Sequence, residues 1–219
     1  MSDAEFALRK EIIAACRSMS ALDINQGTAG NIGVRHGDGL LITPSGIPYE
    51  MMAPEDIVWL GFDGKVEGMR APSSEWRFHR DILAARPDIN AVVHTHAPNA
   101  TAVAMTRRDL PAVHYMIAAA GGSTIRCAPY ATFGTEELSR LALEALADRT
   151  ACLLANHGMI ACGPSLDKAM WLAVEIETLA RQYVIACQLG DPVILDDDEI
   201  AVVVEKFKTY GPRRKDAPA

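Results

Sequence analysis

The histidines of this chain are its most chemically informative residues. His94 and His96 are separated by one residue at the end of the apolar run 91–93, and alternate residues of a β-strand project from the same face. A third histidine, His157, follows the apolar run 151–155. Three converging imidazoles are the ligand set of a catalytic Zn²⁺ that keeps a position open for substrate. One such histidine alone is more often a core residue, but a same-face pair with a third favours a metal site.

Composition limits the class of protein. The chain has 219 residues and no internal shift in composition, which predicts one domain over residues 1–219, with a flexible tail from about 209. The net charge of −7 argues against nucleic acid and acidic membranes as partners. No apolar stretch reaches the roughly 18–20 residues of a membrane span, and no signal peptide is visible, since residues 1–10 are polar and charged. Five scattered cysteines favour free thiols, so we expect a cytoplasmic protein.

The elements that must position the histidines follow from periodicity and turn residues. Helices are predicted over 3–21, 73–85, 99–105, 135–147, 165–189 and 198–208, of which 165–189 is expected to be largely buried. Strands are predicted over 32–35, 40–43, 57–60, 91–96, 111–116 and 151–156. Asp-Gly turns at 38–39 and 63–64 join neighbouring strands. The prediction is an α+β fold, a three-layer α/β/α arrangement in which helices flank a mostly antiparallel sheet.

Three loops combine glycine or proline with hydroxyl groups or free backbone N–H groups. The first, 27–31, fails the spacing of a dinucleotide-binding loop, so it is weak evidence alone and a plain turn is the alternative. The loops 43–46 and 72–75 suit a small oxyanion. Ser73 and Ser74 stand at a predicted helix start, where free N–H groups favour phosphate, although simple helix capping is the alternative.

Glu75 is the only carboxylate in this cluster of loops. A first-turn glutamate commonly does no more than complement the helix dipole. Beside a metal-bound substrate it could instead act as a general base. A ketone and an adjacent hydroxyl chelated by Zn²⁺ have an acidified neighbouring C–H, and the ion stabilises the resulting enediolate.

These segments resemble those of class II sugar-phosphate aldolases, and they occur in the same order over almost the whole chain. The matching segments are 27–31, 41–46, 72–76, 94–96 and 156–158. Three further segments are most similar to L-fuculose-phosphate aldolases: 114–122, 128–135 and 205–211. The same family includes ribulose-phosphate epimerases. The resemblance implies the class II aldolase fold and a homotetramer with its active sites at subunit boundaries.

The resemblance also implies a ligand set and a phosphate site. One Zn²⁺ per subunit would be held by three histidines, with a glutamate joining when substrate is absent: His94, His96, His157 and Glu75. Substrate phosphate would be held by four side chains and by backbone at two glycines: Asn31, Ser45, Ser73, Ser74, Gly30 and Gly46.

Two tyrosines have roles that only the resemblance supplies. Tyr115 would enter from a neighbouring subunit and handle the proton of the aldehyde oxygen, while Tyr210, on the C-terminal tail, would help to close the site. From the residues alone, Tyr115 is a half-buried strand tyrosine with His114 on the opposite face, and Tyr210 is a tail residue. Phe133 is expected in the core or a pocket wall, and His79 in a packing or supporting role.

The implied function is a zinc-dependent aldolase that reversibly cleaves a 1-phosphoketose to dihydroxyacetone phosphate and a small aldehyde. L-Fuculose 1-phosphate, which gives L-lactaldehyde, is the first expectation. Relatives commonly carry Ser in place of Gly33, Thr in place of Ser45 and Asn in place of Thr95. Because Thr95 and Pro98 lie beside the metal ligands, the identity of the aldehyde released from the substrate stays undecided.

Several alternatives therefore stay open. Within the family, 5-deoxyribulose 1-phosphate and 5-methylthioribulose 1-phosphate are alternative substrates, and a ribulose-phosphate 4-epimerase is an alternative enzyme. A non-catalytic interaction domain of this fold would lack the complete ligand set. A Schiff-base aldolase would need a desolvated lysine, which no apolar strand offers.

Overall fold

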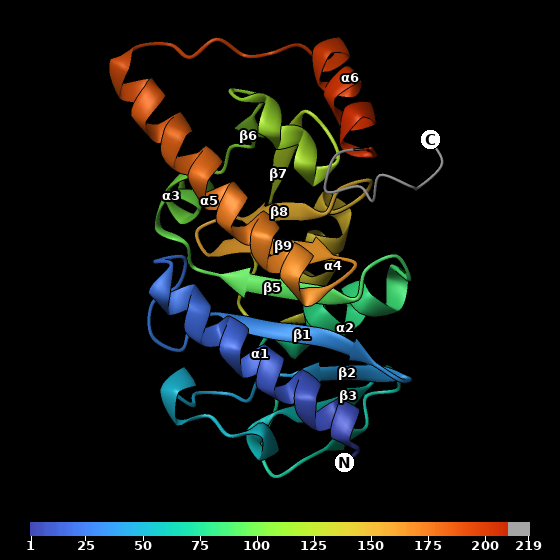
Figure 1. Ribbon diagram of the computed structural model, residues 1–219. Helices are drawn as coiled ribbons and strands as arrows, with labels where there is room; N and C mark the ends of the chain where they lie inside the picture. The colour runs from blue at the N-terminus through green and yellow to red at the C-terminus, as the bar shows by residue number, and fades with distance from the viewer. Residues whose placement is uncertain (210–219) are drawn as a thin grey trace.

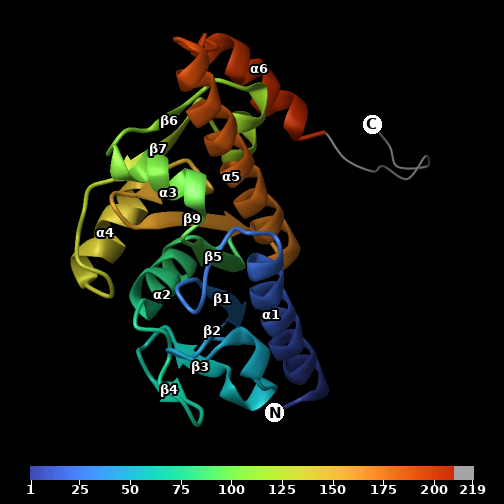
Figure 2. The same ribbon diagram turned by 90° about the vertical axis from the view of Figure 1, so that its left-hand side faces the viewer.

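The sheet at the centre of the molecule has nine strands and carries helices on both faces (Figures 1 and 2). The computed structural model describes residues 1–209. The strands are β1 (Asn31–His36), β2 (Gly39–Ile42), β3 (Val58–Gly61), β4 (Val66–Glu67), β5 (Ala91–Thr95), β6 (Leu110–Pro111), β7 (Thr124–Ala128), β8 (Ala151–Leu154) and β9 (Gly158–Gly163). Their order is β4-β3-β2-β1-β5-β9-β8-β7-β6. Every described pair is antiparallel except β7 with β8, which confirms the predicted fold class.

Helices form the two outer layers. They are α1 (Asp3–Ala21), α2 (Trp76–Ala85), α3 (Pro98–Met105), α4 (Glu136–Ala145), α5 (Leu166–Leu189) and α6 (Asp197–Phe207), with short 3₁₀ helices η1 (Tyr49–Met51), η2 (Pro54–Asp56) and η3 (Tyr115–Ala120). Helices α1 and α5 lie on one face of the sheet and α2 and α4 on the other (Figure 2). No helix among residues 1–209 is both long enough and apolar enough to cross a bilayer.

Strand β5 shows how the sheet separates two cores. Its residues Ala91 and Val93 pack in the core beneath α1 and α5, whereas Val92 packs in the core beneath α2 and α4. This alternation follows from the two-residue repeat of a strand. It places His94 on the face that α2 covers, where its ring lies 5.4 Å from that of Phe78.

The predicted helix start at Ser73 is wrong, because α2 begins at Trp76. The serines belong instead to a loop tied to the end of β2: the Ser73 N–H donates to the Thr43 carbonyl at 2.9 Å. Glu75 takes the N-cap position without using its side chain as a cap. Its carboxylate is therefore free for other contacts.

The predicted strand 111–116 is also wrong. Only Leu110 and Pro111 pair with β7, and the 3₁₀ helix η3 begins at Tyr115. The reason is a local cap, since Nδ1 of His114 accepts a hydrogen bond from the Met116 N–H at 3.2 Å. His114 therefore does not face away from Tyr115; the two rings stack, with centroids 4.7 Å apart.

Two further differences concern the second half of the chain. Strands β7 and β9 were not predicted. Helix α5 is buried only between Leu166 and Ala180, whereas Ile185 and Leu189 are 49% and 86% exposed. The other predicted helices begin and end within about two residues of their observed bounds.

Candidate active site

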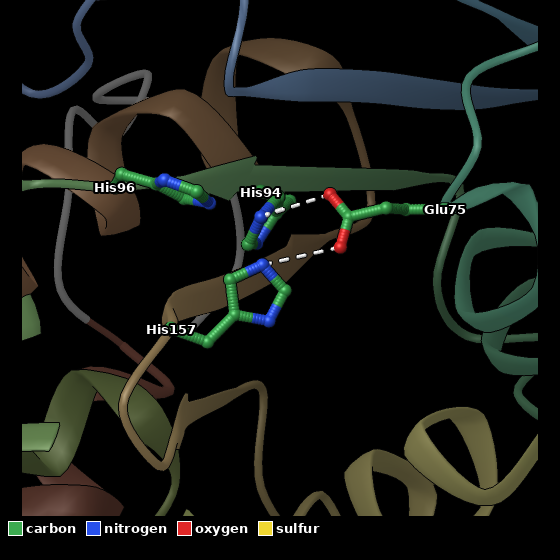
Figure 3. Close-up of side chains that lie close together, drawn as sticks. All are labelled: Glu75, His94, His96 and His157. Carbon is green, nitrogen blue, oxygen red and sulfur yellow. Dashed lines mark ion pairs between the residues drawn. The ribbon is translucent and has the colours of Figure 1, made fainter. Parts of the chain in front are cut away.

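Four predicted ligands meet at one end of β5 (Figure 3). His94 lies in β5, His96 follows the strand, His157 occupies the turn between β8 and β9, and Glu75 precedes α2. The three ring centroids are 4.8, 4.9 and 5.0 Å apart. One ligating atom from each of the four residues lies within 4.8 Å of all the others. The predicted convergence of the histidines is therefore observed.

A glycine makes this convergence possible. Gly158 begins β9 directly after His157, and a Cβ atom there would lie 2.4 Å from the Thr95 carbonyl oxygen and 3.0 Å from Cδ2 of His96. Both distances are shorter than van der Waals contact. The strand ends that carry the ligands can approach only because residue 158 has no side chain.

Hydrogen bonding fixes the ring of His94 for metal ligation. Its Nδ1 lies 2.9 Å from the carbonyl oxygen of Met159, and a carbonyl only accepts, so Nδ1 carries the hydrogen. The other ring nitrogen, Nε2, then faces the cluster and can serve as a ligand, an arrangement usual for metal-binding histidines. The His96 ring is suited in another way, since burial, then the neighbouring His94 and His157, lowers its pKa to about 4 and keeps it neutral.

The Glu75 carboxylate bridges two of these rings. Its Oε2 lies 3.2 Å from Nε2 of His94, and its Oε1 lies 3.1 Å from Nε2 of His157. Burial alone would raise the pKa of this carboxyl, but the two imidazoles outweigh burial and hold the pKa well below its ordinary value. Glu75 is therefore ionised at neutral pH.

The four residues fit a divalent metal ion. Within residues 1–209, Nε2 of His96 is buried without a hydrogen-bond partner, and Nε2 of His94 has only the Glu75 carboxylate beside it. Leaving buried polar atoms unpaired costs free energy unless something else satisfies them. Imidazole nitrogens with a carboxylate are the donor set that Zn²⁺ accepts. A metal ion would supply the missing interaction.

A cavity of about 400 Å³ opens beside the cluster. Its wall includes nine of the predicted site residues: Gly30, Asn31, Ser45, Gly46, Ser73, Ser74, Glu75, His96 and His157. His94 is fully buried and does not line the cavity. The loops 27–31, 43–46 and 72–75 therefore share one cavity with the cluster.

Within residues 1–209, the cavity wall is polar without being cationic, because no lysine or arginine of this part of the chain lines it. Ser45 and Ser74 are exposed, and Gly46 adopts a positive φ of 70°, which glycine tolerates readily. Ser73 is buried, and its Oγ accepts a hydrogen bond from the Glu75 N–H at 3.3 Å. An anion here would be held by hydroxyl and N–H groups.

Asn31 contacts the carboxylate as well as the cavity. It pairs directly with His94 across β1 and β5, and its Nδ2 donates to Oε2 of Glu75 at 2.9 Å. Its Oδ1 lies 2.5 Å from Nε2 of His79. The supporting role expected for His79 thus corresponds to a contact with Asn31.

Of the two predicted tyrosines, Tyr115 does not line this cavity. Tyr115 is 50% exposed and lines a separate cavity with residues of α6, among them Val203 and Phe207. Tyr210 lies outside the described residues, as does nearly all of the predicted flexible tail.

Some lining residues were not predicted. Thr28, Tyr130 and Asn156 reach the cavity. Phe133, which was expected in the core or a pocket wall, is 64% exposed and belongs to the wall. Asn156 has a positive φ of 54°, a conformation that asparagine adopts more readily than most residues. An asparagine before a His-Gly pair is the signal that could have identified this turn.

The Gly30 loop is held to the metal strand by a buried chain of hydrogen bonds. The Tyr49 hydroxyl donates to the Gly30 carbonyl at 2.6 Å and accepts from Nδ2 of Asn25 at 3.0 Å. Oδ1 of Asn25 accepts from the His96 N–H at 3.2 Å. No local sequence pattern indicates this connection, because it joins residues that only the tertiary structure brings together.

The fold and the site define a three-layer α/β/α enzyme with a candidate metal centre beside an anion-suited cavity. The chain belongs to the Class II Aldolase and Adducin N-terminal domain family, whose model matches residues 10–184. It is an aldolase of this class, and its similarity to individual proteins supports the assignment.

Two curated relatives cover nearly the whole chain. The chain is 56% identical over 207 residues to L-fuculose phosphate aldolase of Escherichia coli K12, covering 94% of this chain and 96% of the relative. It is 57% identical over 211 residues to 5-methylthioribulose-1-phosphate/5-deoxyribulose-1-phosphate aldolase of Rhodospirillum rubrum, covering 96% of each. A solved L-fuculose 1-phosphate aldolase superposes with a TM-score of 0.91 at 41% identity, covering 95% of this chain and 98% of that one.

Proposed function

We propose that the protein is a zinc-dependent aldolase that reversibly cleaves a 1-phosphoketose to dihydroxyacetone phosphate and a small aldehyde. L-Fuculose 1-phosphate is the first-choice substrate and L-lactaldehyde its aldehyde product, as the name of the E. coli relative suggests. The observation that carries the proposal is the cluster of Glu75, His94, His96 and His157 at the wall of the cavity. A non-catalytic domain of this fold would not need all four.

The metal cluster would bind the ketone end of the substrate, and the three loops would bind its phosphate. Zn²⁺ held by the three histidines would supply a Lewis acid that acidifies the C–H next to a chelated ketone. The phosphate would be bound by hydroxyl and N–H groups of the three loops: Gly30, Asn31, Ser45, Gly46, Ser73 and Ser74. Such groups bind phosphate without a full positive charge, which suits a cavity whose described lining residues include no lysine or arginine.

Glu75 is the proposed base. In the condensation direction its ionised carboxylate takes the C–H proton from dihydroxyacetone phosphate, and in the cleavage direction it returns a proton to the same carbon. Its position supports this role, because it is 5% exposed yet lines the cavity next to His157.

Tyr115 is proposed to move the proton of the aldehyde oxygen in the site of a neighbouring subunit. Its place outside the cavity of its own chain supports this assignment. The proposal also includes the family's homotetramer, closure of the site by Tyr210, a single domain over 1–219 and a cytoplasmic location.

A second substrate is favoured by the R. rubrum relative, which acts on 5-methylthioribulose 1-phosphate and 5-deoxyribulose 1-phosphate according to its name. The sequence pointed to Thr95 as a determinant of this choice, but Thr95 is fully buried. Tyr130 and Phe133 are exposed at the cavity. They are better placed to contact the aldehyde half.

Product analysis tests the proposal. Zinc-loaded protein is incubated separately with the three 1-phosphoketoses, and release of dihydroxyacetone phosphate is measured by a coupled reduction. We expect release that stops after chelation and returns with added Zn²⁺. An epimerised pentulose phosphate without free dihydroxyacetone phosphate would indicate the epimerase instead. Activity that resists chelators, together with trapping by borohydride, would indicate a Schiff-base aldolase.

A further inference from the structure

We propose that His79 is a positioning residue for the base: it fixes the amide of Asn31, which in turn orients the carboxylate of Glu75. This inference rests on the proposed function, because the role of Glu75 as the base is part of that proposal. His79 neither lines the cavity nor belongs to the cluster of four ligands. Its effect would pass entirely through Asn31.

The sheet creates the place for His79. Asn31 and Gly33 are two residues apart on β1 and pair with His94 and Val92 of β5, so both face the layer that contains α2. The His79 ring packs against Gly33, where a Cβ atom would lie 2.8 Å from its Nδ1. The absence of a side chain at Gly33 gives the ring room to reach Asn31.

The hydrogen bonds between the three side chains have one consistent direction. Nδ2 of Asn31 donates to Oε2 of Glu75 at 2.9 Å, since a carboxylate oxygen is the acceptor in such a pair. Oδ1 of Asn31 then faces His79, at 2.5 Å, and Nε2 of His79 must carry the hydrogen. Nδ1 of His79 is buried and has no hydrogen-bond partner among the described residues.

This direction determines what His79 does. An asparagine amide can turn over and exchange its oxygen and nitrogen at almost the same shape. If it did so here, Oδ1 would point at the carboxylate and repel it. The N–H of His79 prevents this, because it requires an oxygen opposite it.

The contact matters because Glu75 has few other fixed partners. Apart from His94 and His157, Asn31 is the only side chain within residues 1–209 that hydrogen-bonds its carboxylate. When substrate oxygens occupy the space beside the two rings, the Asn31 N–H is the contact that remains. Oriented bases lose efficiency steeply when they are displaced by about 1 Å.

Two substitutions separate this role from simple packing. His79→Gln keeps an N–H near the position of Nε2, whereas His79→Leu removes it at similar volume. Solvent exchange of the dihydroxyacetone phosphate C–H proton is measured on both zinc-loaded variants. We expect His79→Leu to lower kcat for exchange by about 10- to 100-fold with little change in KM or zinc content. His79→Gln should recover most of the loss. Equal loss in both variants, or loss in neither, would overturn the inference.

A measurement on the unaltered zinc-loaded protein covers the case in which His79→Leu does not fold. Nitrogen-15 NMR of labelled histidine distinguishes the two neutral tautomers of the ring. We expect His79 to carry its hydrogen on Nε2, and a hydrogen on Nδ1 would refute the assigned direction. Failure of the proposed function looks different, since the wild-type protein itself would then neither exchange the proton nor release dihydroxyacetone phosphate.

Discussion

Three side chains contact the carboxylate of Glu75, and its possible roles depend on which of these contacts persist when a metal ion binds. Two imidazoles, those of His94 and His157, contact one carboxylate oxygen each, while the Asn31 amide contacts Oε2 from the side of the sheet. A metal ion would compete for the two rings and would leave the amide in place. The carboxylate is therefore suited to serve first as a ligand and then as a base.

Replacing Glu75 by glutamine separates these two functions. The amide cannot take a proton from carbon, so exchange of the dihydroxyacetone phosphate C–H with solvent should fall by roughly 10²- to 10⁴-fold. Zinc should stay bound, because all three histidines remain. Proton exchange by NMR and metal analysis check the two halves of the prediction, with Ser74→Ala as a control that should raise KM instead. Unchanged exchange would remove Glu75 from the role of base.

The buried His79 should make stability depend on pH. Burial, then the neighbouring His94, lowers its pKa to about 3, against an ordinary value of about 6.5 in the unfolded chain. Between these values the unfolded chain binds a proton that the folded chain does not. The contribution of the neutral His79 to the free energy of unfolding is therefore fully present above pH 6.5. It is lost as the pH falls toward 3, by up to about 1.4 kcal/mol per pH unit.

Metal-free His79→Gln should lose less stability than the metal-free wild type over this range. Urea unfolding at several pH values between 6.5 and 4.5 measures the two slopes. The other titrating groups are common to both proteins and cancel in the comparison. Parallel slopes would show that His79 does not titrate in this way.

At the scale of elements, the close ends of β5 and β9 control the geometry of the cluster. Gly158→Ala would place a methyl group 2.4 Å from the Thr95 carbonyl oxygen and 3.0 Å from the His96 ring. We expect zinc affinity to fall about 10- to 100-fold, as when groups that orient metal ligands are disturbed. Competition with a chromophoric chelator measures this.

Gly163→Ala is the matched control, because it adds an equally close methyl group at the other end of β9, 2.6 Å from the Ala169 nitrogen. Both variants should lower the unfolding temperature. Only Gly158→Ala should weaken zinc binding. A similar loss of zinc affinity in both would attribute the effect to general destabilisation of the strand.

The elements that the sequence predicted well are those with local signals. Apolar periodicity predicted α1 and α4. Asp-Gly turns predicted the pairing of β1 with β2 and of β3 with β4. The errors arose where tertiary contacts overrode local pattern. Ser73 belongs to a loop because it pairs with the end of β2, and 111–116 is not a strand because His114 caps a 3₁₀ helix.

The site likewise contains features that local sequence patterns predict and features that depend on tertiary contacts. The convergence of His94 and His96 was predictable, because strand geometry alone places them on one face. The contact of Asn31 with Glu75 was not, since it depends on the register of β1 against β5. The resemblance supplied the three loops that are proposed to bind phosphate, and the pairing of Pro44 with Pro72 explains why two of them, 43–46 and 72–75, lie together.

At the scale of the whole molecule, the proposed site is larger than one chain. Tyr115 lies beside α6, away from the cavity that Glu75 lines. If it serves a neighbouring subunit, two inactive variants can complement each other. We expect a refolded mixture of Glu75→Gln and Tyr115→Phe chains to cleave substrate faster than either variant alone, because some mixed sites carry both original residues.

Separate assays of the two variants sharpen this test. Tyr115→Phe should impair cleavage more than proton exchange, whereas Glu75→Gln should abolish both. Mixing the folded variants without refolding provides the control, since subunits that do not exchange cannot complement. A refolded mixture no more active than the average of its components would place Tyr115 in the site of its own chain or outside catalysis.

Gly33 gives this protein an evolutionary option at small mutational distance. Glycine and serine codons can differ by a single base, and a serine there would bring a hydroxyl close to the unpartnered Nδ1 of His79, provided the ring shifts to admit its Cβ. Selection could in this way change how His79 and Asn31 orient the carboxylate of Glu75, without altering any of the three histidines.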